Sequence, residues 1–224
     1  MNSLEHDQAL RSLLNRLHAQ SEAQMPALMK HFEKYGGDSV AGTEAQIASG
    51  RPFWRDKLVA IDPGKAQFCY LLCRALLARR VVEAGTSYGV STLYLAAALR
   101  DNGGGVVIAT EYESEKAKTA RAHFAEAGLA GQIELREGDL RETLKQIAGP
   151  VDFMLMDIWT PMVRPAIELV APHLRRGAVV IADNTNWYRE AYADYFAFLN
   201  DPANGFSTQT LPFEGGLEMS VKLG

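Results

Sequence analysis

The sequence predicts an α/β protein with a doubly wound, mostly parallel seven-stranded sheet, a C-terminal antiparallel hairpin and additional N-terminal helices. From about residue 60 onward, short apolar runs alternate with stretches of helical periodicity, which is the pattern of repeated βαβ units. The runs at 151–156 and 178–182 are almost continuously apolar, as expected for strands buried on both faces. We therefore expect an N-terminal helical segment at 1–60 and an α/β domain at 61–224.

The N-terminal segment is predicted to be helical over about residues 4–34, with an interruption at Pro26, and again over 43–48. Gly36-Gly37 and Gly50-Arg51-Pro52 are expected to break these helices. The segment is also rich in large apolar side chains, which predict core, dimer or pocket contacts: Met25, Met29, Phe32, Tyr35, Phe53 and Trp54.

The α/β part begins at Asp62-Pro63, which predicts an N-cap and the first residue of a helix that runs to about Ala78. Strands are then expected from 81 and over 105–110, 132–136, 151–156 and 178–182. The helices that alternate with them are predicted over 91–99, 114–127, 141–148, 165–174 and 188–199. Two last strands, about 206–212 and 216–222, meet at a hairpin turn at Gly215-Gly216.

The composition argues against three classes of protein: nucleic-acid-binding, membrane-spanning and zinc-binding proteins. Hydrophobic residues make up 47% and charged residues 22%, and the net charge of −4 without a dense basic run argues against a nucleic-acid partner. No apolar run reaches the roughly 18 residues that span a membrane, and the polar start predicts a cytoplasmic protein without membrane association. The only cysteines, Cys69 and Cys73, share one face of a predicted helix; we expect core residues, because a zinc site needs two further ligands that no Cys/His pair supplies.

Polar residues follow the predicted strands, where the ligand site of such a sheet lies. After the first strand, Gly85 and Gly89 permit a tight turn and close approach of a ligand. Hydroxyl groups stand beside them at Thr86, Ser87 and Ser91, and the N-terminus of the next helix favours an anion. The alternative interpretation is a strand-to-helix turn that merely requires glycine.

The other strand ends carry acids. Glu111, with Tyr112 after it, can accept both hydroxyls of a ribose or can cap the following helix. Asp139, with Leu140 after it, can reach an adenine edge or cap the helix at 141. Asp157 follows the fourth strand, and 183–185 (Asp-Asn-Thr) follow the fifth. Together they predict a cleft for a nucleoside with a charged tail.

The stretch Val81–Leu93, with an acid two residues before its first glycine and a serine after its second, resembles the glycine loop of class I S-adenosylmethionine (SAM)-dependent methyltransferases. The likeness is to the catechol and caffeoyl-CoA O-methyltransferase group and covers roughly residues 60–224. The segment 62–67 resembles the part of that family that lies against the cofactor.

The resemblance implies SAM, or its product S-adenosylhomocysteine (SAH), as cofactor. Glu83, Gly85, Ser87 and Ser91 would surround the methionine part, and Glu111 would hold the ribose. The full implied set is Ile61, Glu83, Gly85, Thr86, Ser87, Gly89, Ser91, Glu111, Tyr112, Asp139, Leu140, Asp157 and Trp159.

The resemblance also implies a divalent cation, Mg²⁺ or Ca²⁺, held by Asp157, Asp183 and Asn184. Such a cation would bind two adjacent oxygens of the acceptor and lower the phenol pKa. The alternative for Asp183-Asn184 is a turn and helix cap. Trp187 and Tyr188 are expected to wall the acceptor pocket, and the family resemblance favours a homodimer.

The sequence departs from the family at Thr160, where the catalytic lysine usually stands. Threonine cannot act as a general base near neutral pH, so the base is unknown and Asp157 is assigned only the organisation of metal and substrate. The expected function is O-methylation of a small catechol-like or other hydroxylated aromatic acceptor. The alternative is a non-catalytic or differently specialised SAM-binding protein.

The glycine loop also resembles the motifs of two other classes of enzyme. Residues 85–89 match the G-x-S-x-G pattern of hydrolases, but no histidine follows His173 to complete a triad. A dinucleotide oxidoreductase expects G-x-G-x-x-G, whereas this loop reads G-x-x-x-G. Among the histidines, only His31 is considered for the wall of an active site.

Overall fold

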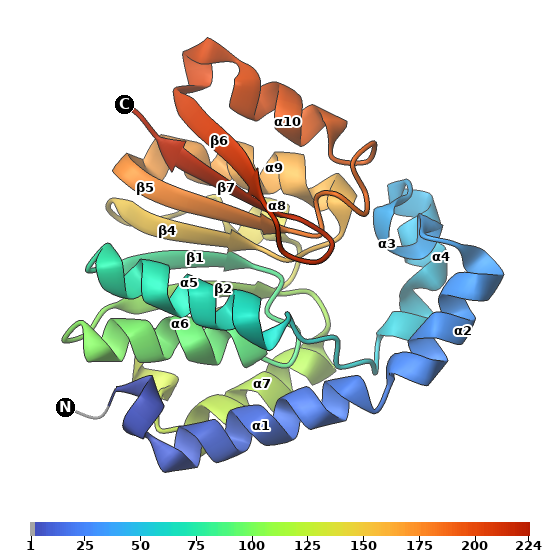
Figure 1. Cartoon of the computed structure of the whole chain (residues 1–224), viewed down its shortest axis with the longest axis horizontal. Helices are drawn as coiled ribbons and strands as arrows, with labels where there is room; N and C mark the ends of the chain where they lie inside the picture. The colour runs from blue at the N-terminus through green and yellow to red at the C-terminus, as the bar shows by residue number, and fades with distance from the viewer. Residues whose placement is uncertain (1–2) are drawn as a thin grey trace.

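A seven-stranded sheet in the order β3-β2-β1-β4-β5-β7-β6 forms the centre of the computed structural model, which describes residues 3–224 (Figure 1). The strands are β1 (Arg80–Ala84), β2 (Val106–Glu111), β3 (Ile133–Glu137), β4 (Val151–Met156), β5 (Leu174–Asp183), β6 (Phe206–Leu211) and β7 (Leu217–Lys222). β1 to β5 pair in parallel, and β7 is antiparallel to both β5 and β6. The predicted fold class is confirmed.

The helices either cover the sheet or lie beyond its strands. They are α1 (Gln8–Glu22), α2 (Met25–Tyr35), α3 (Asp38–Ala41), α4 (Glu44–Trp54), α5 (Pro63–Ala75), α6 (Val90–Asp101), α7 (Ser114–Glu126), α8 (Leu140–Thr143), α9 (Thr160–Val170) and α10 (Ala193–Asn200), with short 3₁₀ turns η1 (Leu4–His6), η2 (Ala130–Gln132), η3 (Ala171–His173) and η4 (Pro202–Asn204). None of the helices within residues 3–224 combines the length and the apolar character needed to cross a membrane.

Two apolar layers lie on the two faces of the sheet. Val81 and Phe153 belong to the apolar layer with residues of α1, α5, α6 and α7, whereas Val82 and Met154 belong to the layer with residues of α8, α9 and α10. Figure 1 shows these two groups of helices on the two faces of the sheet. Each strand therefore buries successive side chains on opposite faces, which explains the continuous apolar runs that the sequence shows. Cys69 and Cys73 lie in the first layer as buried free thiols, as expected.

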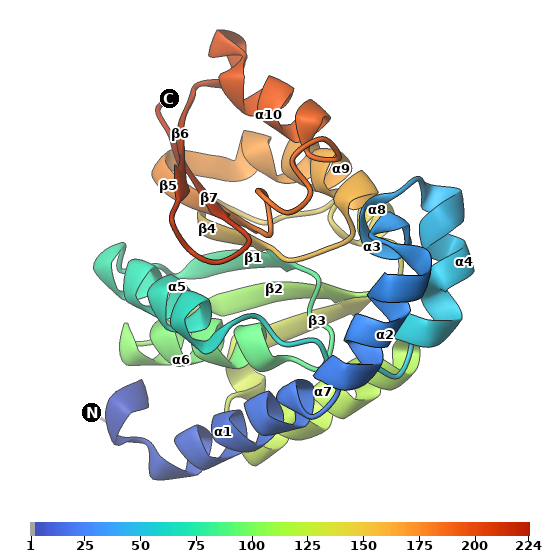
Figure 2. The ribbon, with the colours of Figure 1, turned by 45° about the vertical axis from the view of Figure 1, so that its right-hand side comes forward.

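The helices α2, α3 and α4 lie beyond the carboxyl ends of the parallel strands (Figure 2). α4 is joined to this edge by an ion pair between Glu44 and Arg141, 3.1 Å apart, and by Trp54, whose ring centroid is 5.7 Å from that of Trp159. The N-terminal segment thus borders the edge where the functional residues are expected.

The expected interruption near Pro26 is confirmed, because α1 ends at Glu22 and α2 begins at Met25 with Pro26 in its first turn, where its missing N–H has no helical partner in any case. The break expected at Gly50-Arg51-Pro52 is wrong. Gly50, Arg51 and Pro52 lie inside α4. The helix continues through Pro52 because the next residues are held by packing: Phe53 stacks on His31 with 3.8 Å between ring centroids.

Three later helices also differ from their predicted extents. α8 ends at Thr143 rather than at 148, α9 covers 160–170 rather than 165–174, and α10 begins at Ala193 rather than at 188. Pro161, not Pro165, stands in the first turn of α9, and the residues after 173 extend β5. Turns replace helix over 184–192, where Asn184 has a φ of 59° and the Tyr192 hydroxyl donates to the carbonyl oxygen of Asp183 at 2.8 Å.

The prediction that Asp62 caps and stabilises the N-terminus of α5 can be tested by mutation. Asp62 Oδ1 accepts hydrogen bonds from the N–H groups of Gly64 at 2.8 Å and Lys65 at 3.1 Å. We expect Asp62→Ala to lower the free energy of unfolding by about 1 kcal/mol in urea titrations. Asp62→Asn keeps an acceptor oxygen and is expected to lose much less; equal losses in both variants would contradict the capping role.

Candidate functional site at the carboxyl ends of the strands

The loop between β1 and α6 passes so close to β4 that it requires glycine. A Cβ on Gly85, whose φ is 99°, would lie 2.0 Å from the carbonyl oxygen of Asp157. A Cβ on Gly89, whose φ is 86°, would lie 2.4 Å from the Phe124 ring. Ser87 between them also has a positive φ, 49°, which is uncommon for a residue with a side chain. Both glycines are therefore required by contacts within the protein, and close approach of a ligand to them stays a prediction.

Glu83 is fully buried at the end of β1. Its Oε2 accepts hydrogen bonds from the hydroxyls of Thr86, at 2.9 Å, and Thr92. Its Oε1 is buried and has no hydrogen-bond partner among residues 3–224. Burial raises the pKa of Glu83, against the hydroxyl donors that lower it. The Glu83 Oε1 atom is therefore a buried hydrogen-bond acceptor without a donor in the described part of the chain, and it lies at the base of the glycine loop.

Glu111, at the end of β2, lies beneath the same loop. Its Oε2 accepts the N–H of Ser87 at 2.7 Å, and its Oε1 accepts the N–H of Glu113 at 2.7 Å. Burial raises the pKa of the Glu111 carboxyl, and the charge of Lys116 opposes this rise. Lys116, which sequence reasoning did not single out, is itself buried, and its Nζ lies 3.5 Å from Ser87 Oγ.

The residues predicted at the third strand end are engaged within the protein. Asp139 caps α8 through the N–H of Arg141 at 2.9 Å and pairs with the guanidinium of Arg141, which lowers the pKa of Asp139. Leu140 is a core residue. Tyr112 is exposed beneath Arg51, which lies 4.1 Å from its ring centroid. The capping alternative for Asp139 is thus what the structure shows, and contact with an adenine stays a prediction.

Asp157 follows β4 and donates its backbone N–H to the carbonyl oxygen of Ala84 at 3.1 Å. Burial, with the nearby Asp183 carboxylate, raises the pKa of Asp157 to about 8. Trp159 is half-buried against Trp54, and Thr160 is buried in the first turn of α9. Ile61 lies in the core just before α5, and Ser91 is buried in the first turn of α6.

Lys65 forms a buried ion pair with Asp183, the acid at the end of β5. The Nζ of Lys65 is 2.5 Å from Oδ1 of Asp183, and the two side chains are only 4% and 5% exposed. The same oxygen of Asp183 accepts the N–H of Asn184 at 2.7 Å. Burial raises the pKa of Asp183, whereas the Lys65 ammonium and the Asn184 N–H lower it.

The role of Lys65 was missed from sequence, although a signal was available. Lys65, Cys69 and Cys73 are spaced by four residues and share the buried face of α5. A lysine on the apolar face of a helix must have a charged or polar partner inside the protein. Which carboxylate provides it depends on how β5 lies beside α5, and that information is not local.

The predicted metal ligands do not fit a divalent cation while Lys65 holds this position. Mg²⁺ and Ca²⁺ require several oxygen ligands within about 2.0–2.6 Å. Asp183 Oδ1 already accepts two N–H donors. Asn184 Oδ1 lies 2.9 Å from the Cβ position of Gly215, against the turn between β6 and β7. Among residues 3–224, no group of three or more His, Cys, Asp or Glu side chains could hold a metal ion.

The N-terminal helices contact both ends of this row of residues. Arg51 and Arg55 of α4 lie 3.7 and 3.8 Å from Glu113, just past Glu111. At the other end, a Cβ on Gly37 would lie 3.2 Å from the Tyr188 ring. Trp187 beside it is 60% exposed. The segment α2–α4 therefore borders the space above the strand ends from Glu113 to Tyr188.

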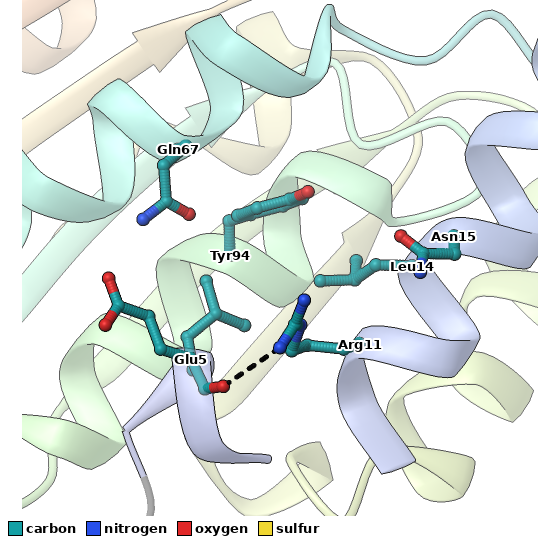
Figure 3. A pocket seen from close by; sticks show the side chains of 7 residues that line it. Glu5, Arg11, Leu14, Asn15, Gln67 and Tyr94 are labelled. Carbon is teal, nitrogen blue, oxygen red and sulfur yellow. Dashed lines mark hydrogen bonds between the residues drawn. The ribbon is translucent and has the colours of Figure 1, made fainter. Parts of the chain in front are cut away.

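A cavity of about 410 Å³ lies elsewhere, between η1, α1, α5 and α6 (Figure 3). Arg11 donates there to the carbonyl oxygen of Glu5 at 3.2 Å. It is lined by Leu4, Glu5, Arg11, Leu14, Asn15, Gln67 and Tyr94. None of the side chains predicted to bind a cofactor, metal or acceptor lines it, so it is distinct from the strand-end site.

Sequence comparison with known proteins finds similarity to methyltransferases. Residues 82–185 match a family described as a methyltransferase domain. The chain is 30% identical over 149 residues to a catechol O-methyltransferase of Niastella koreensis, covering 65% of this chain and 64% of that protein. It is 35% identical over 127 residues to a catechol O-methyltransferase of Mycobacterium tuberculosis, covering 56% and 57%. The chain thus spans less than two thirds of the length of these curated relatives.

Solved structures share the fold. An O-methyltransferase of Streptomyces achromogenes in complex with SAM superposes with a TM-score of 0.68 at 23% identity, over 80% of this chain and 89% of the other. One from Bacillus cereus in complex with SAH gives 0.68 at 22% identity, over 84% and 96%. Residues 82–185 are thus similar to a methyltransferase domain, the fold is that of O-methyltransferase structures, and the expected resemblance to the catechol and caffeoyl-CoA O-methyltransferase group is confirmed.

The close contact at Gly85 can be tested by thermal unfolding. Gly85→Ala forces a side chain against the Asp157 carbonyl, at a cost of about 3 kcal/mol, or about 6–12 °C in the unfolding midpoint. Gly128→Ala is the matched control, because Gly128 has a φ of 66° but nothing within 4 Å of its Cβ position. The control should lose about 1 kcal/mol; equal losses would show that the Asp157 contact is unimportant.

Proposed function

We propose that this chain is a SAM-dependent O-methyltransferase that acts on a hydroxyl group of a small aromatic acceptor. The observation that carries the proposal is the joint arrangement at the ends of β1 and β2. Glu83 Oε1 is an orphaned acceptor beneath the glycine loop, and Glu111 is held beneath the same loop by the Ser87 N–H.

The charged and polar groups of SAM each have a suitable partner among the residues at the strand ends. The Glu83 carboxylate suits the ammonium of the methionine part, and the N-terminus of α6, whose N-cap Gly89 provides no side-chain cap, suits its carboxylate. Glu111 suits the two ribose hydroxyls. When bound, SAM supplies a methyl group on a positively charged sulfur. The solved relatives from Streptomyces achromogenes and Bacillus cereus are in complex with SAM and SAH.

The reaction is a displacement at the methyl carbon. A bond forms between the acceptor oxygen and this carbon while the carbon–sulfur bond breaks, leaving SAH, the methyl ether and the proton of the acceptor hydroxyl. The residues of this chain have to hold the oxygen in line with the sulfur and stabilise its negative charge. Thr160 provides no base for the proton.

A catechol-like acceptor is favoured by the names of the relatives and by the aromatic side chains near the strand ends. Residues 1–60 are proposed as the segment that completes the acceptor pocket, opposite Trp187 and Tyr188. Exposed Met25, Met29 and Tyr35 on α2 make this segment suitable for contact with a second copy in a homodimer. The divalent cation implied by the resemblance stays a prediction, and the contacts of Asp183 favour a different cation.

The alternative is a SAM-binding protein without turnover, which only the substitution at Thr160 favours. The two relatives named above are catechol O-methyltransferases, and this supports an enzyme. Methyl transfer to catechols, flavonoids or hydroxycinnamoyl thioesters distinguishes the two, since the alternative binds SAM and methylates none of them.

Calorimetric titration with SAM tests the cofactor site. Glu111→Ala removes the proposed ribose acceptor, and loss of a charge-assisted hydrogen bond of about 1.5–3 kcal/mol should weaken binding by about 10–150-fold. Glu115→Ala is the control, because Glu115 is an exposed acid in the next helix. An unchanged affinity in Glu111→Ala, or no SAM binding by the wild-type protein, would overturn the cofactor assignment.

Steady-state kinetics with catechol test the acceptor wall. We expect Trp187→Ala to lower kcat/KM for catechol by about 3–10-fold, the value of one lost aromatic contact, with unchanged affinity for SAM. Trp187→Phe keeps an aromatic ring and should retain most of the rate. If the Ala variant matches wild type, the acceptor does not contact Trp187.

A further inference from the structure

The Lys65–Asp183 ion pair is a built feature of the strand-end site. Asp62 caps the first turn of α5 and fixes the backbone of Lys65 through its N–H. Asp183 is fixed by the Asn184 N–H and by Tyr192, whose hydroxyl donates to the Asp183 carbonyl oxygen. Both partners of the pair are therefore held from independent elements, and neither side chain is more than 5% exposed.

The ammonium pairs with the acid at the end of β5 and acts electrostatically on the acid that follows β4. These strands are neighbours, with Met156 opposite Ala182, so that Asp157 and Asp183 follow adjacent positions of the sheet. Lys65 interacts electrostatically with both carboxyl groups. It thus uses one of the three ligands that the resemblance implies for a divalent cation and acts on the charge of a second.

We propose that Lys65 is the resident cation of the acceptor site, in place of a divalent metal, and that it receives the acceptor oxygen directly. Within residues 3–224, its ammonium donates one hydrogen bond, to Asp183. An ammonium has three N–H donors, which leaves two for an acceptor oxygen. The inference rests on the proposed methyltransferase function and adds the group that stabilises the oxyanion.

The nature of the cation has a consequence for specificity. A metal ion organises an acceptor by binding two adjacent oxygens, which selects vicinal diols. An ammonium group acts as a point charge with independent donors and needs only one oxygen. The acceptor class of this enzyme should therefore include monohydroxylated aromatic compounds as well as catechols.

The first measurement uses the wild-type protein after dialysis against EDTA. Mn²⁺ titration followed by electron paramagnetic resonance should detect no protein-bound ion, and methylation should be equal with EDTA and with Mg²⁺. Binding of one Mn²⁺ that Asp183→Asn abolishes, or turnover that EDTA abolishes, would overturn the proposal.

The second measurement removes the ammonium. Lys65→Ala should lower kcat by about 10²–10³-fold, the effect of removing one donor to a developing oxyanion, while SAM affinity is retained. It should also acquire Mn²⁺ binding, because Asp157 and Asp183 are freed; a variant that keeps the wild-type rate contradicts the proposal. Lys118→Ala, at an exposed position of α7, is the control. If Lys65→Ala does not fold, Lys65→Met preserves more of the buried volume, and the wild-type measurements decide alone.

The third measurement compares 4-hydroxybenzaldehyde with 3,4-dihydroxybenzaldehyde in the presence of EDTA. Methylation of both supports Lys65 as the cation, and methylation of the dihydroxy compound alone contradicts it. SAM calorimetry on the same samples separates the two proposals. Absence of SAM binding defeats the methyltransferase function, whereas SAM binding together with a bound Mn²⁺ defeats only the role of Lys65.

Discussion

The site depends on the close contact between the ends of β1 and β4. These strands are neighbours in the sheet although β2 and β3 come between them in the chain. At such a switch point the connecting loops diverge to opposite faces and leave a crevice. Gly85 lies so close to the Asp157 carbonyl that no side chain fits between them. The same contact brings the buried Glu83 and Asp157 to one edge.

Two of the buried acids at this edge have a lysine beside them. Glu111 lies beside Lys116, and Asp183 lies on Lys65. Burying such pairs costs desolvation free energy, and replacing them with apolar residues is often neutral or stabilising. Their presence is therefore better explained by what they bind than by stability. One lysine lies near Glu111, the acid proposed to bind the ribose, and the other near the proposed acceptor position, so each half of the strand-end site has its own buried cation.

The sequence predicted the order and type of the core elements because their signals are local. Alternating apolar runs, the Asp62 cap and the Gly215-Gly216 turn each act within a few residues. The errors arose where distant contacts decide: Pro52 stays helical beside Phe53, which stacks on His31, and the partner of Lys65 is Asp183, 118 residues away. The strand-end acids were located correctly, since topology fixes where strands end, but their hydrogen-bond partners come from loops that the sequence does not place.

The burial of Lys65 beside Asp183 has a physical explanation in the chemistry of the proposed methyl transfer. A methyl-transfer site for a hydroxyl acceptor needs positive charge beside the oxygen, since the oxygen must carry negative charge as it attacks. The resemblance implies a catalytic base at the position of Thr160, a role that the Lys65 ammonium does not take; under our proposal Lys65, in the first turn of α5, supplies the positive charge beside the oxygen. The pair is fixed before substrate arrives, because Asp62, Asn184 and Tyr192 hold its two backbones. A cation preorganised in this way needs no metal to be recruited.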